Sequence, residues 1–179
     1  LRVLDEAFKY EKMSGGAFSP RASGGNLQCP LAPQPGSFDL GAIGKGYAID
    51  RALEKLWGRG VTRFVIGCGS TIYGSGAPPG NVGWQVTLRH PREGKAETIL
   101  LMDQAISTSG DYERSMMQDG VRINHIVDPR SGLPVDRVIS CSVIAKTAAE
   151  SDALSTAASV LGEKGGIALL DARENVEGI

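Results

Sequence analysis

A glycine-rich turn that leads into a helix, within Phe38–Arg51 (FDLGAIGKGYAIDR), constrains the fold of this chain more than any other stretch. From Ile49 onward apolar residues recur at helical spacing, with Asp50 among the charged residues on the other side. Glycines at the start of a helix let a ligand approach the backbone, whose free N–H groups bind anions. Lys45 adds a positive charge there and Asp39 a carboxylate. The stretch therefore fits a nucleotide-binding turn made mostly of backbone.

The turn matches neither of the common phosphate-binding motifs. Gly46 stands where a P-loop has Ser or Thr after its lysine, and the pattern GxGxxG is absent. Taken alone, the stretch favours an ordinary strand–turn–helix junction whose glycines only make the turn. The later segments have to decide between the two interpretations.

Size and composition exclude several classes of protein. A chain of 179 residues with a net charge of −1 indicates one domain and gives no case for binding nucleic acid or an anionic membrane. No apolar run is long enough to span a bilayer. Three cysteines without a CxxC pair indicate neither a disulfide framework nor a zinc site. The chain begins with Leu1 and shows no signal peptide, so we expect a fragment whose compartment stays open.

Paired strands mixed with separate helices predict an α+β fold, a single domain over 1–179 with a mixed or antiparallel sheet and packed helices. Helices are expected at 1–12, 46–57, 148–161 and 165–172. Strands are expected at 63–66, 84–88, 98–102, 123–127 and 138–145. The glycine-rich segments 67–70 and 74–83 and the polar segment 106–114 are predicted to be turns or loops.

A long loop rich in Gly, Pro and Ser is expected over 14–37, and loops of this length are usually functional or disordered. Phe18 lies alone in it, between helix- and strand-breaking residues. Its ring either packs the loop onto the core or offers a flat surface to a ligand ring. Both interpretations stay open.

The late helix carries the candidate metal ligands. Thr147 and Glu150 have the spacing of a capping box, which predicts a helix start at Thr147. Asp152 and Thr156 are four residues apart and so lie on one side of that helix, with Ser155 adjacent. Such oxygens suit Mg²⁺, which usually takes one or two carboxylates from a protein. Alternatively, Asp152 interacts with the helix dipole and Thr156 bonds back to its own helix.

The chain has two histidines. His90, beside Pro91 at a strand end, is expected on the surface. His125 ends a strand just before an Asp-Pro turn, where it either satisfies a structural hydrogen bond or reaches a cleft.

Four segments together resemble the ApbE family, the FAD:protein FMN transferases: 16–20, 39–50, 107–114 with 125–134, and 149–162. They occur in the family's order and cover most of the chain. The resemblance implies an enzyme that splits FAD at its pyrophosphate with Mg²⁺. The FMN half is then attached through a phosphoester to a Thr or Ser of an acceptor protein. Many members are exported or lipid-anchored, which implies the bacterial periplasm or the outer face of a membrane.

The resemblance also implies roles for individual residues. The residues expected against FAD are Ala17, Phe18, Ser19, Asp39, Lys45 and Val127. The residues expected around Mg²⁺ are Ala42, through its carbonyl, Asp152, Ser155 and Thr156. The residues expected near the reacting phosphate are His125 and Asp111. The chain departs from the family in three places. Ser19 stands where the loop usually has Asp, the stretch before Asp39 is short, and an earlier N-terminal portion is absent.

Phosphoryl transfer needs positioning and charge neutralisation more than covalent help from the protein. His125 is predicted to accept the proton of the attacking hydroxyl, with Asp111 as second choice. An FAD pyrophosphatase that releases FMN and AMP and a non-catalytic flavin-binding module stay open as alternatives. An enzyme that splits the dinucleotide requires the oxygens of the late helix to lie within a cation's reach of the turn before the early helix.

Overall fold

The computed structural model describes residues 2–21, 36–90, 92–110, 115–118, 121–135 and 138–179. Its helices are α1 (Arg2–Met13), α2 (Gly44–Trp57) and α3 (Ala148–Asp171). Its strands are β1 (Phe64–Cys68), β2 (Thr71–Ser75), β3 (Trp84–Arg89), β4 (Ala96–Leu101), β5 (Gln104–Gly110), β6 (Ser115–Gln118), β7 (Val121–Asn124), β8 (Ser140–Ala145) and β9 (Glu177–Gly178).

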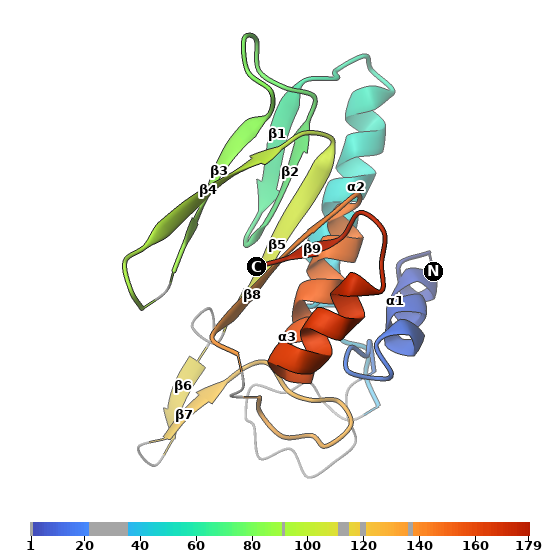
Figure 1. The fold of residues 1–179 in the computed structure, drawn as a ribbon. Coiled ribbons are helices and arrows are strands. Elements are labelled where there is room, and N and C mark those ends of the chain that lie inside the picture. Colours follow the sequence, from blue (N-terminus) through green and yellow to red (C-terminus); the bar gives the residue numbers. More distant parts are fainter. Residues whose placement is uncertain (1, 22–35, 91, 111–114, 119–120, 136–137) are drawn as a thin grey trace.

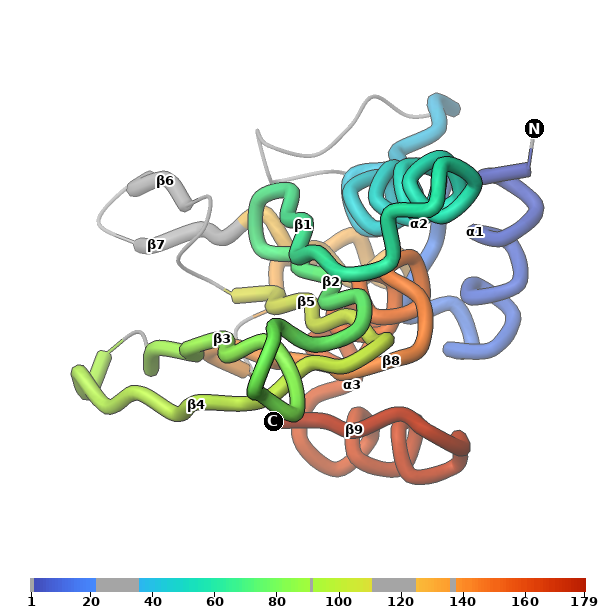
Figure 2. Tube along the Cα trace, turned by 90° about the horizontal axis from the view of Figure 1, so that it is seen from above, coloured from blue at the N-terminus to red at the C-terminus, as the bar shows by residue number. Residues whose placement is uncertain are grey.

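An antiparallel sheet in the order β1-β2-β5-β8-β9 organises the fold, and the predicted α+β class is confirmed. Helices α2 and α3 cover one face of the sheet, and α1 packs against α3 (Figure 1). The β3–β4 hairpin lies on the other side of the sheet, as the view from above shows (Figure 2). Within the described part of the chain, no helix has both the length and the apolarity to cross a bilayer.

The core between α3 and the sheet is made of small side chains on the helix. Alanines of α3 pack with Phe18, Ile43 and Val143, and these last three side chains are each at most 1% exposed. Small residues let α3 lie close to β5 and β8, which is why its polar side chains also come near the sheet. The helix begins where the capping box predicts, since the Thr147 side chain accepts the Glu150 N–H at 3.2 Å. Gly162 interrupts it with φ 75° and ψ 178°, as the sequence indicates.

The loop predicted over 74–83 starts two residues too early, because Thr71–Ser75 forms β2, whereas residues 76–83 form a loop as predicted. Gly74 is needed there for close packing rather than for a turn. A Cβ at this position would stand 3.0 Å from Leu101 and from Trp84 of the β3–β4 hairpin. β1 likewise continues through Gly67 to Cys68, two residues past the predicted end.

The prediction of a polar turn over 106–114 was wrong as far as the structure describes it. Gln104–Gly110 forms β5, the central strand of the sheet. Its hydroxyls can be buried because each has a partner: Ser107 bonds Thr71, Thr108 bonds Ser142, and Ser109 bonds Ser155 on α3.

Candidate functional site

The first turns of α2 and α3 touch directly at Gly46. A Cβ on Gly46 would lie 2.1 Å from the carbonyl oxygen of Ala148, so only glycine allows this approach. The Gly46 N–H donates to Asp152 Oδ2 at 3.0 Å, across 106 residues of sequence. The late helix therefore lies against the turn before the early helix, as the sequence interpretation requires.

Asp152 is the centre of this contact and is 1% exposed. Its Oδ1 lies 2.8 Å from Lys45 Nζ and accepts a hydrogen bond from Ser107 Oγ at 3.3 Å. Lys45 Nζ also donates to the carbonyl of Gly41 at 3.2 Å. A buried carboxylate needs such partners, because its desolvation is otherwise costly. Lys45 and Asp152, predicted separately from two helices, thus form one ion pair at the helix junction.

Hydroxyl groups extend the site along α3. Ser109 Oγ shares hydrogen bonds with Ser155 Oγ at 2.9 Å and Thr156 Oγ1 at 3.1 Å. Ser155 and Thr156 also donate back to the Asp152 carbonyl, at 3.0 and 3.4 Å. A hydroxyl that donates its proton keeps lone pairs that can accept a cation. The structure thus contains the back-bonding that the sequence left as an alternative, and it does not remove the ligand capacity of these oxygens.

The donor set around Asp152 fits Mg²⁺ better than a softer metal. It consists of one carboxylate with neighbouring hydroxyls, all oxygen, and Mg²⁺ usually completes such a shell with waters and substrate phosphates. No cluster of three or more His, Cys, Asp or Glu side chains occurs in the described ranges, so these residues hold no closed zinc-type site. A cation bound at Asp152 would share the carboxylate with Lys45.

The turn before α2 is tied to the segment around Phe18. The Asp39 N–H donates to the Pro20 carbonyl at 2.8 Å, and the exposed Asp39 carboxylate accepts the Gly41 N–H at 2.8 Å. Ala42 follows in the same turn, half-buried beside the start of α2. Asp39, Ala42 and Lys45 therefore belong to one short segment that leads to Asp152.

The side chains of Ala17 and Phe18 are in the core, at 0% and 1% exposure. The Phe18 ring meets Tyr10 edge-to-face with centroids 6.4 Å apart. This favours the interpretation of Phe18 as a ring that packs the segment onto the core, and leaves its backbone to meet a ligand. Ser19 Oγ donates to Glu11 of α1, and Arg21 pairs with the same carboxylate.

His125 is half-buried and follows β7, just before a bridge between Val127 and Pro134 that closes a tight turn. Asp111 lies outside the described residues. His90 is half-buried at the end of the β3–β4 hairpin. Its Nδ1 accepts the backbone N–H groups of Arg92 and Glu93 at 3.3 and 3.0 Å, so this ring has a local structural role.

Sequence reasoning missed three residues of the site. Ser107 and Ser109 were assigned to a turn, although alternation along a strand would have placed both on one face. Asp50 was placed on the charged side of α2, yet its carboxylate accepts the N–H groups of Ala148 and Ala149. Burial raises the pKa of Asp50, and the two N–H groups offset part of the rise. Its position four residues after Gly46 was the available signal.

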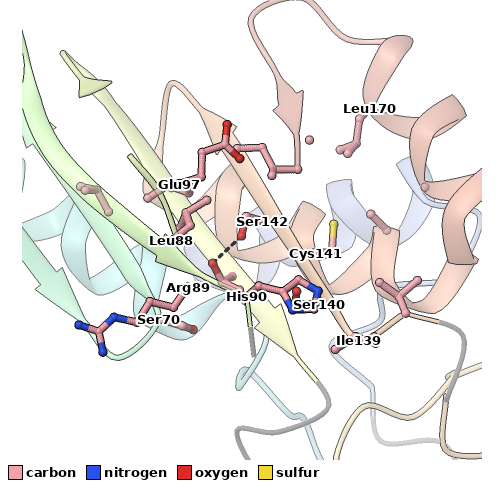
Figure 3. Close-up of a pocket in the computed structure, with 18 of the residues that line it drawn as sticks. Ser70, Leu88, Arg89, His90, Glu97, Ile139, Ser140, Cys141, Ser142 and Leu170 are labelled. Carbon is pink, nitrogen blue, oxygen red and sulfur yellow. Dashed lines mark hydrogen bonds between the residues drawn. The ribbon is translucent and has the colours of Figure 1, made fainter. Parts of the chain in front are cut away.

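A separate cavity of about 1280 Å³ opens on the other face of the sheet (Figure 3). It is bounded by the β3–β4 hairpin, β5, β8, β9 and the later part of α3. Its lining includes Thr108 and Ser142, whereas Ser107 and Ser109 point to the helix face. The cavity and the Asp152 site are therefore on opposite faces of β5.

Comparison with protein families matches residues 22–179 to the ApbE family. An FAD:protein FMN transferase of Vibrio cholerae is 35% identical over 140 residues, 76% of this chain and 42% of the relative. One of Klebsiella pneumoniae is 36% identical over 151 residues, 82% of this chain and 46% of the relative. The chain thus spans less than half the length of these curated relatives.

Solved structures agree with the fold. The ApbE protein of Thermotoga maritima superposes with a TM-score of 0.84 at 26% identity, covering 99% of this chain and 71% of that one. The flavin transferase ApbE of Vibrio cholerae gives a TM-score of 0.81 at 26% identity, with 99% and 69% covered. The first turn of α2 is rich in glycine, a buried acid faces it from α3, and the family match covers most of the sequence. This chain therefore belongs to the ApbE family.

Proposed function

We propose that this chain transfers FMN from FAD to a Thr or Ser hydroxyl of an acceptor protein, with Mg²⁺, and releases AMP. The observation that carries the proposal is the junction of α2 and α3, where Lys45 and the Gly46 N–H meet the buried Asp152 carboxylate. Family membership, and relatives described as FAD:protein FMN transferases, support it. We also propose the bacterial periplasm or the outer face of a membrane as its compartment, on family resemblance alone.

In the proposed reaction the acceptor hydroxyl oxygen forms a bond to the phosphorus of the FMN half. The bond from that phosphorus to the bridging pyrophosphate oxygen breaks, and AMP leaves with the bridging oxygen. The hydroxyl proton passes to a base, which we assign to His125, with Asp111 as second choice. This step adds negative charge to the phosphoryl oxygens and to the leaving group, and the site has to neutralise it.

Several residues at the junction of α2 and α3 would neutralise this negative charge. Asp152 would hold Mg²⁺ with the hydroxyls of Ser155 and Thr156 and the carbonyl of Ala42. When bound, Mg²⁺ supplies positive charge at the pyrophosphate. Lys45 lies beside the same carboxylate and carries a second positive charge toward the substrate.

The flavin dinucleotide would contact the turn before α2 and the two segments near it. In this proposal Asp39 binds from the turn, and Ala17, Phe18 and Ser19 bind mainly through backbone, because two of their three side chains are in the core. Val127 would bind from the turn after His125. These assignments follow the family pattern at matching positions of this sequence.

Mass spectrometry of a Thr-containing acceptor protein, after incubation with this chain, FAD and Mg²⁺, tests the proposal. The acceptor should gain the mass of an FMN phosphoester while AMP accumulates in equal amount. Rapid AMP release without any acceptor would instead identify an FAD pyrophosphatase. FAD binding without AMP in either sample would identify a non-catalytic flavin-binding module.

Replacing Asp152 with Asn should lower FMN transfer by on the order of 100-fold or more, because the neutral amide removes the charged ligand. Asp171→Asn is the matched control, since it removes an exposed carboxylate at the far end of the same helix. Its transfer rate should equal that of the unmodified chain. Equal rates for the two variants would refute the assignment of Asp152.

A further inference from the structure

The start of α3 is capped in part by another helix. Its N-cap residue, Thr147, accepts the Glu150 N–H through Oγ1 and the Ser151 N–H through its carbonyl. The two N–H groups before these, of Ala148 and Ala149, donate to Asp50 Oδ1 and Oδ2 of α2, each at 2.9 Å. Helix starts leave such N–H groups without partners inside the helix. The carboxylate of Asp50 therefore completes the cap of α3.

Conversely, the start of α2 is capped by a residue of α3. Its N-cap residue, Ile43, makes no side-chain hydrogen bond. The N–H of Gly46, the third residue of α2, donates instead to Asp152 Oδ2 on α3. Each helix thus supplies the carboxylate that caps the other, and we refer to the pair Asp50 and Asp152 as the reciprocal cap.

The two halves of the reciprocal cap lie on either side of the Gly46–Ala148 contact. Asp50 is one helical turn after Gly46 on α2, and Asp152 is one turn after Ala148 on α3. Since backbone meets backbone between them, the helices have no flexible side chain there to absorb a shift. The two hydrogen bonds to Asp50 on one side of this contact and the Gly46–Asp152 bond on the other fix both the separation and the rotation of α3 against α2.

From this geometry we infer that Asp50 is a positioning residue for the reaction. It holds the first turn of α3 so that the Asp152 carboxylate faces Lys45 and Gly46 at the proposed metal site. Asp50 itself contacts neither metal nor substrate in this assignment. The part of the inference that concerns metal and FMN transfer rests on the proposed function, whereas the part that concerns the Gly46–Asp152 bond does not.

Hydrogen exchange at the Gly46 amide tests the inference without any metal or flavin. In Asp50→Asn, one acceptor becomes an NH₂ donor that faces an N–H group, so one of the two hydrogen bonds that Asp50 accepts is lost. The Gly46 amide should exchange at least about 10-fold faster, although Gly46 has no contact with the substituted atoms. The amide of Ile106 in β5 reports global unfolding in the same sample and corrects for it.

Thr147→Ala is the matched control, because it also removes a cap from α3 but leaves α2 untouched. It should leave Gly46 exchange within about 2-fold of the unmodified chain after the same correction. Equal exchange in the two variants would mean that Asp50 only stabilises α3, and would overturn the inference. Should Asp50→Asn fail to fold, Asp50→Ser, which keeps one acceptor, serves in the same comparison.

Mn²⁺ as a paramagnetic probe of the proposed Mg²⁺ site gives the second readout. Asp50→Asn should weaken Mn²⁺ binding by about 10-fold or more, as loss of a residue that orients a ligand commonly does, and Thr147→Ala by less than about 2-fold. Faster Gly46 exchange with unchanged Mn²⁺ affinity would reduce Asp50 to a structural cap. If the unmodified chain binds no Mn²⁺, the proposed function loses its metal site, and the Gly46 amide alone decides whether Asp50 positions Asp152.

Discussion

Single atoms decide the geometry of the site at Gly46. The neighbouring Gly44 has only the Leu40 Cβ near its missing side chain, at 3.9 Å, whereas a Cβ on Gly46 would strike the Ala148 carbonyl. Both glycines have ordinary helical backbone angles, so conformational freedom does not explain either of them. Gly46 is required for space alone, and this requirement cannot be read from the motif GAIGKG.

Gly46→Ala should lower the free energy of unfolding by about 1–3 kcal/mol or more, because the added methyl group forces α2 away from α3. Gly44→Ala is the control two residues earlier in the same turn, where an added Cβ would meet only Leu40, at 3.9 Å. It should leave stability unchanged or raise it by up to about 1 kcal/mol through helix propensity. Urea unfolding followed by circular dichroism measures both, and equal midpoints for the two variants would contradict the described contact.

At the scale of elements, prediction succeeded where a signal is local. The capping box at Thr147 and the Asp152–Thr156 spacing depend on residues within one or two turns, and both appear in α3 as expected. The prediction for the segment that forms β5 was wrong because hydroxyl-rich sequences usually form turns. Its place in the centre of the sheet depends on Thr71 and Ser142, which are far away in sequence and provide the partners of its hydroxyls.

The two faces of β5 should respond differently to loss of a hydroxyl. Ser107→Ala removes a partner of both Thr71 and the buried Asp152, so we expect a loss of about 1–3 kcal/mol in stability and a lower rate of FMN transfer. Thr108→Val removes the hydroxyl that faces Ser142 on the other side and should keep the transfer rate within about 2-fold. Assays of the proposed transfer and urea unfolding of both variants give the comparison, which fails if Thr108→Val lowers the transfer rate more than Ser107→Ala does.

For the whole molecule, the pattern of paired strands mixed with separate helices predicted the α+β class, and the sheet confirms it. The sequence interpretation required the junction at Lys45 and Asp152 but did not itself predict that it forms. Its existence depends on how α2 and α3 pack, which no local pattern specifies, and family resemblance supplied the link. The contribution of Asp50 was missed for the same reason, since its partners are about a hundred residues away in sequence.

Buried thiol and tyrosine hydroxyl groups should make the stability of the whole molecule fall at alkaline pH. Desolvation raises the pKa of Cys141 to about 11 and that of Tyr73 to about 12. The unfolded chain loses the thiol proton above about pH 8.5 and the tyrosine proton above about pH 10, before the folded chain loses either. The folded state then binds more protons than the unfolded state, so stability should fall as the pH rises from about 9 through 11.

Urea midpoints at pH 8.5 and 10.5, compared between the unmodified chain and Cys141→Ala, measure the thiol's share. The variant should lose less stability over this interval, by at most about 1.4 kcal/mol for each pH unit. Cys68→Ala is the control, because it also removes one thiol, but at an exposed position. Parallel curves for all three proteins would show that the Cys141 thiol is not held neutral by burial.

The cavity between the β3–β4 hairpin and the later part of α3 has a consequence for inhibitor discovery. A compound that binds among Leu88, Ile139 and Leu170 would lie in this cavity (Figure 3), on the face of β5 opposite to Asp152. Such a compound would not compete with a nucleotide at the helix junction. Any effect on the proposed FMN transfer would have to pass through the backbone of β5, and would appear as a lower maximal rate at saturating FAD.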